Sequence, residues 1–208
     1  MGFAEPVPWL HDFAARAGLR YEPDADERWF RAWEPFATLR VPVHYTHALH
    51  TTSPDGHSSI SIARMGLTIR AHSPTGAGLV DTEMRAWVAI VQDARMSALV
   101  ADGPVAVTSD RGSAFSETWD LISLPRRMTG DGPFDQVFAT FSKTADTSKA
   151  ISKSLRKLLL SWRAPVHAEV RAGGFVLCPT LLPADPASVS WLLTAAGIFG
   201  NKATKPES

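Results

Sequence analysis

The spacing of the hydrophobic residues changes near Leu39, and this change constrains the fold more than any other feature. Between Pro8 and Ala17 the apolar residues lie three or four positions apart, as on one face of a helix. From Leu39 the period becomes two, which is typical of half-buried strands. The alternating apolar positions are Leu39, Val41, Val43 and Tyr45.

The C-terminal part predicts a strand, a helix, a hairpin and a last helix, in that order. Two adjacent glycines suit the tight turn of the hairpin. An Asp-Pro pair suits the start of the last helix, which we expect to end at Gly200. The expected ranges are Val137 to Phe141, Thr147 to Trp162, Val166 to Cys178, and Asp185 to Gly200.

These patterns predict one α+β domain over residues 1–200, with residues 201–208 as a disordered tail. A mainly antiparallel sheet is expected, with the N-terminal and C-terminal helices packed on one side over its apolar face. The chain has 208 residues, of which 45% are hydrophobic, so it can bury a sizeable core.

Composition excludes several classes of protein. The formal net charge is zero, which removes the broad attraction on which non-specific nucleic-acid binding depends. The single cysteine, Cys178, can form neither an intramolecular disulfide nor a Cys-rich metal site. The longest apolar stretches, such as 191–199, have about half the length that crosses a bilayer, and no signal-peptide pattern is present. We expect a cytoplasmic, soluble protein.

Three features are similar to an uncharacterised group of bacterial cytosolic proteins, a domain of unknown function. They are the segment 17–21 (Ala-Gly-Leu-Arg-Tyr) after the first helix, the strands around Gly66, and the strand, helix, hairpin and helix from Phe134 onward. The resemblance covers most of the chain. It implies the fold described above and assigns no active-site residues.

Four histidines lie close together in the sequence and invite a metal or hydrolase interpretation. On a strand, His44 and His50 would share a face but lie about 20 Å apart, with His47 on the other face. This spacing predicts no metal site built from all three, since one ion needs ligands at about 2 Å. A hydrolase using His44, His47, Asp55 and His57 stays open as an alternative function.

The helix expected from Thr147 has an unusually one-sided charge. Lys149, Lys153, Arg156 and Lys157 fall within about 100° of one another on the helical wheel, and no Asp or Glu lies between Thr147 and Trp162. Two interpretations stay open. The face is either solvated, with its later cations favoured by the helix dipole, or a docking face for an acidic partner, an anionic membrane or nucleic acid.

No catalytic motif is complete: the sequence lacks His-Glu-x-x-His, Cys-x-x-Cys and a phosphate-binding glycine loop. Cys178 is expected to be buried, with His167 as the nearest candidate base. We therefore predict a non-catalytic interaction or accessory module without a cofactor or metal, whose candidate partner is an acidic protein. A small-molecule binding protein with a pocket near Trp119 is a further alternative.

Overall fold

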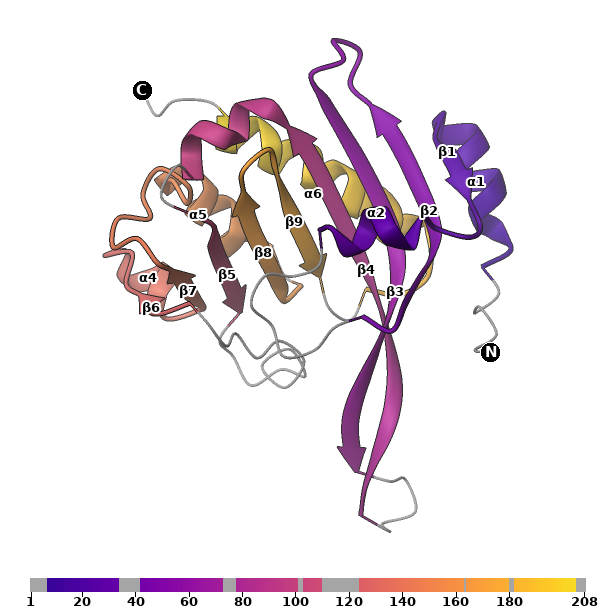
Figure 1. The fold of residues 1–208 in the computed structure, drawn as a ribbon, viewed down its shortest axis with the longest axis horizontal. Helices are drawn as coiled ribbons and strands as arrows, with labels where there is room; N and C mark the ends of the chain where they lie inside the picture. Colours follow the sequence, from indigo (N-terminus) through magenta and orange to yellow (C-terminus); the bar gives the residue numbers. More distant parts are fainter. Residues whose placement is uncertain are drawn as a thin grey trace.

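The computed structural model describes residues 7–33, 42–72, 78–100, 103–109, 124–162, 164–179 and 182–204. Within these residues the chain forms a nine-stranded antiparallel sheet in the order β1-β2-β3-β4-β9-β8-β5-β7-β6 (Figure 1). The strands are β1 (Arg20–Glu22), β2 (His44–Thr52), β3 (Ser58–His72), β4 (Leu79–Asp93), β5 (Val105–Ser109), β6 (Arg126–Arg127), β7 (Phe138–Ser142), β8 (Val166–Arg171) and β9 (Gly174–Pro179).

Side chains at the start of several helices bind the free backbone N–H groups there. Asp26 accepts from Trp29 N, Asp131 from Phe134 N and Ser152 from Leu155 N. The helices are α1 (Trp9–Ala17), α2 (Glu27–Arg31), the 3₁₀ helix η1 (Ala94–Val100), α4 (Gly132–Asp135), α5 (Lys153–Ser161) and α6 (Pro186–Thr204).

The sheet is covered on both faces. One core joins α1, η1, α5 and α6 to Trp87, Ala89 and Leu177 of the central strands. A second core on the opposite face joins Phe30 of α2 to residues such as Met65. In Figure 1, α6 lies behind the sheet and α2 lies in front of β2, β3 and β4.

The expected α+β class, with an antiparallel sheet and the C-terminal helix packed on it, is confirmed. The expectation that all the helices lie on one side is corrected for α2, which covers the other face because Phe30 packs against Tyr45 and His50 of β2. The first part of the strand expected from Leu39 falls on residues 34–41, which lie outside the described residues.

Two predicted helix ends are wrong. The helix expected from Thr147 begins only at Lys153, because Ser152 caps it and the preceding residues form a turn. Gly200 does not end α6, which continues to Thr204. A Cβ at Gly200 would lie 3.3 Å from the Phe175 ring, so this glycine permits a close approach of α6 to the sheet. Residues 201–204 of the predicted tail are therefore helical.

Strands β3 and β4 are 15 residues long and reach beyond their neighbours. Pairing of β3 with β2 ends at Gly66, and pairing of β4 with β9 begins at Ala89. The outer part of the hairpin therefore projects from the body as a two-stranded ribbon (Figure 1).

Replacing Leu159 by Ala should lower the free energy of unfolding by about 2–5 kcal/mol, because the side chain is fully buried under α5. Leu160→Ala, one residue further on the exposed side of α5, is the matched control and should cost less than about 1 kcal/mol. Urea denaturation measures both. Equal losses would show that α5 does not bury the face assigned to it.

Candidate functional site

The histidine and aspartate residues of the hydrolase alternative do not come together. His44 and Thr52 mark the two ends of β2, about 26 Å apart along the strand. His44 Nε2 lies 3.4 Å from Glu83 Oε1, and His47 Nδ1 lies 2.8 Å from the Tyr21 hydroxyl. These contacts keep the two histidines in separate surroundings on the sheet.

Asp55 and His57 lie in the turn that joins β2 to β3. The Asp55 carboxylate accepts hydrogen bonds from the Ser53 hydroxyl and from His57 N, the latter at 3.0 Å. These bonds, that of Ser53 first, hold the pKa of Asp55 below its ordinary value. The carboxylate therefore stabilises the turn. Among the described residues, no three His, Cys, Asp or Glu side chains are placed to share a metal ion.

The residues of the predicted basic face separate into two groups. Lys149, Lys153 and Lys157 are exposed, with Lys149 in the turn before α5. Arg156 is different, because only 13% of its side chain is exposed. Its Nε donates to Asp131 Oδ2 at 3.1 Å, and its Nη1 donates to Ile151 O at 2.8 Å. The expectation that Arg156 shares the open face of the lysines is wrong.

Asp131 connects α4 to α5. One of its carboxylate oxygens caps α4 by accepting from Phe134 N, and the other binds Arg156. The hydrogen bond from Arg156 is the main reason that the pKa of Asp131 lies below its ordinary value. The helix wheel could not reveal this link, because the two residues are 25 positions apart.

A turn between β6 and α4 continues this surface. Arg127 Nε donates to Ser142 O at 3.0 Å and its Nη2 to Lys143 O at 2.9 Å. Thr129 donates through its backbone N and its hydroxyl to Asp135 Oδ1, at 3.1 and 2.9 Å. Met128, between these two anchored residues, is 69% exposed. No motif in the sequence points to this turn.

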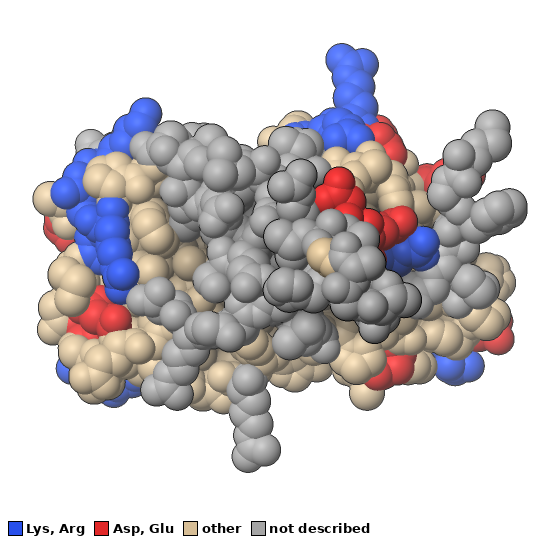
Figure 2. Space-filling model, turned by 90° about the horizontal axis from the view of Figure 1, so that it is seen from below, with Lys and Arg blue, Asp and Glu red and all other residues tan. Residues whose placement is uncertain are grey.

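These elements form one basic end of the molecule. Residues 124–162 carry seven Lys or Arg and three Asp or Glu, a net charge of +4, while the rest of the chain has a net charge of −4. Figure 2 shows Lys and Arg side chains gathered at the end that carries α4, β6 and β7. We call this surface the basic end; its cations are Arg126, Arg127, Lys143, Lys149, Lys153, Arg156 and Lys157.

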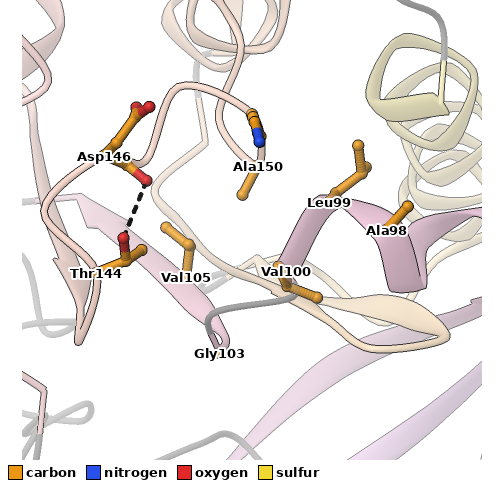
Figure 3. Close-up of a pocket in the computed structure, with 9 residues that line it drawn as sticks. Ala98, Leu99, Val100, Gly103, Val105, Thr144, Asp146 and Ala150 are labelled. Carbon is orange, nitrogen blue, oxygen red and sulfur yellow. Dashed lines mark hydrogen bonds between the residues drawn. The ribbon is translucent and has the colours of Figure 1, made fainter.

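A small cavity lies beside the basic end (Figure 3). Its lining includes Val100, Thr144 and Asp146, and Lys149 borders it. The volume is about 30 Å³, which is enough for about one water molecule. This cavity is too small for an organic ligand.

A larger hollow of about 470 Å³ opens between the end of α5 and the start of α6. Trp162 and Trp191 line it, with their rings edge to face at a centroid distance of 5.5 Å. The small-molecule alternative was placed at Trp119, which lies outside the described residues. This open apolar hollow is larger than the cavity beside the basic end.

A buried charged group lies on β8. The His167 and Glu169 side chains are fully buried, and His167 Nε2 donates to Glu169 Oε1 at 2.6 Å. Arg171 Nε donates to the other carboxylate oxygen at 2.9 Å. Burial alone would raise the pKa of Glu169, but the bond from His167 and the nearby positive charges lower it below its ordinary value.

The Cys178 thiol is not activated by this group. Burial, with the negative charge of Glu169, raises its pKa well above the ordinary value. His167 is opposite Cys178 in the strand register, but its Nε2 is engaged by Glu169. The thiol therefore stays protonated and behaves as a small apolar side chain of the second core.

The fold is similar to the crystal structure of the mycobacterial trehalose monomycolate transport factor A, TtfA. The TM-score is 0.58 at 12% sequence identity, and the match covers 97% of each chain. At this identity the likeness shows a shared fold. No protein-family model matches the sequence, and no curated protein is significantly similar to it. None of the helices in the described part of the chain has the length and hydropathy that a membrane crossing requires.

Glu169→Gln should lower the free energy of unfolding at pH 7 by about 3–5 kcal/mol, because it breaks a buried ion pair. The folded-state pKa of Glu169 lies below its ordinary value of 4.5. The carboxylate therefore stabilises the fold above that pH, and this contribution is lost as the pH falls through the folded-state pKa. Urea unfolding at decreasing pH should show the two proteins converging; a gap that widens on acidification would contradict the assignment.

Proposed function

We propose that the chain is a non-catalytic accessory module that binds an anionic partner through the basic end. The observation that carries this proposal is the exposure of Lys149, Lys153 and Lys157, while the nearby acids are occupied. Asp131 is bound by Arg156, and Asp135 by Thr129. Residues 124–162 still carry seven cations against three acids, so this surface keeps a net positive charge for a partner.

The fold likeness supports an accessory role. TtfA is named as a transport factor for trehalose monomycolate, and its chain and this one share a fold over 97% of each length. By this likeness we extend the proposal to an accessory component in the transport of a lipid-linked molecule. A cytoplasmic location is part of the proposal, because the single buried cysteine requires no oxidising compartment.

The hydrolase alternative receives less support from the geometry. A nucleophile and its base need to lie within hydrogen-bond reach of each other, whereas His44 and His47 are held at Glu83 and Tyr21. The Asp55 carboxylate accepts a hydrogen bond within its own turn.

The partner of the basic end can be an acidic protein or a membrane.

Replacing Lys149, Lys153 and Lys157 together by Glu should abolish binding of the anionic partner. The fold should persist, because exposed charge changes usually alter stability by less than about 0.5 kcal/mol each. Wild-type binding should also weaken as the salt concentration rises, since the charges are solvent-exposed. Pull-down at low and high salt, with thermal melting as the folding control, measures both effects. Recovery of the same partners by wild type and variant would refute the proposal.

A further inference from the structure

We infer that the basic end docks on the surface of an anionic lipid bilayer, with the Met128 side chain entering the headgroup region. This inference rests on the proposed function, since it names the partner of the same surface. Three observations carry it: the exposure of Met128, the kind of exposed cation on the same end of the molecule, and the distribution of charge along the chain.

Met128 is an apolar side chain presented to solvent by an ordered turn. It is 69% exposed, yet the residues on both sides are fixed. Arg127 is bound to the carbonyl oxygens at the end of β7, and Thr129 is bound to Asp135. A membrane-surface segment combines an apolar side chain that enters the lipid with cations that stay at the headgroups. The basic end has both: Met128 is the apolar side chain, and the exposed lysines are the cations.

The cations on which the inference depends are lysines. Arg127 and Arg156, whose forked guanidinium groups suit recognition of one fixed carboxylate or phosphate, donate to groups within the chain. The exposed lysines are point charges on flexible stems. They suit a fluid surface on which anionic headgroups have no fixed arrangement, better than they suit an acidic protein with fixed carboxylates. These are Lys143, Lys149, Lys153 and Lys157.

The charge distribution orients the molecule. Residues 124–162 carry a net charge of +4, against a net charge of −4 for the rest of the sequence, so an anionic surface attracts the basic end most strongly. A nucleic-acid partner fits less well, because such domains are usually basic overall and an exposed methionine does not bind phosphates. The predicted contact is peripheral and reversible.

Binding to vesicles tests the inference. At low salt, the wild-type chain should bind and co-sediment with vesicles of phosphatidylglycerol and phosphatidylcholine in equal amounts. Vesicles of phosphatidylcholine alone should not retain it. Lys153→Glu with Lys157→Glu should weaken binding at least ~10-fold, since each cation near an anionic surface contributes roughly five-fold. The matched control is Arg16→Glu with Arg28→Glu, which makes the same change in net charge on exposed residues of α1 and α2.

The apolar contribution has its own pair of variants. Met128→Ser should weaken vesicle binding by roughly three-fold or more, because it removes the inserted side chain. Val43→Ser, at a residue that is 55% exposed outside the basic end, should leave binding unchanged. Melting curves show that each variant is folded.

Two results would overturn the inference. One is the absence of binding to anionic vesicles by the folded wild-type chain at low salt. The other is an equal loss from both charge-reversal pairs, which would mean that the basic end is not the contact. Suppose that the wild-type chain does not bind vesicles but binds a protein partner in a salt-sensitive way, and that the variant with all three lysines replaced does not bind this partner. The membrane inference is then refuted and the proposed function stands. If the chain binds neither vesicles nor a protein partner through the lysines, the membrane inference and the proposed function are both refuted.

Discussion

The central strands have apolar side chains on both faces, and the arrangement of the helices follows from the need to cover them. Every residue of β9 is buried: Phe175 and Leu177 belong to one core, and Val176 and Cys178 belong to the other. An uninterrupted apolar run of this kind requires a layer on each side of the sheet. Helices α5 and α6 cover one face, and α2 supplies Phe30 to the other. The position of α5 fixes the position of the basic end.

Much of the fold follows from patterns that are local in the sequence. The alternation from Val166 predicts β8, and the apolar spacing predicts α1, α5 and α6. The face that α2 covers could not be predicted in this way, because it depends on which sheet residues Phe30 meets. The same holds for the end of α6: Gly200 resembles a stop signal, but its role is a close approach to Phe175.

The candidate site was predicted only in part. The sequence points to three lysines that are exposed in the structure, but it also groups Arg156 with them. Arg156 instead joins α5 to the cap of α4 through Asp131, a contact between segments distant in sequence. Because this link joins α5, which carries two of the lysines, to α4 and the turn before it, the basic end is a product of tertiary structure. The charge excess of residues 124–162 was the signal that could have revealed it.

An environment-sensitive fluorophore at residue 128 tests the orientation of the basic end most directly. Cys178 is fully buried with a raised thiol pKa, so the label reacts selectively with Met128→Cys. The account predicts a blue shift of the emission when vesicles containing phosphatidylglycerol are added, and no shift from the same label at Val43→Cys. Equal shifts at both positions, or no shift at residue 128 while the protein is bound to the vesicles, would contradict it.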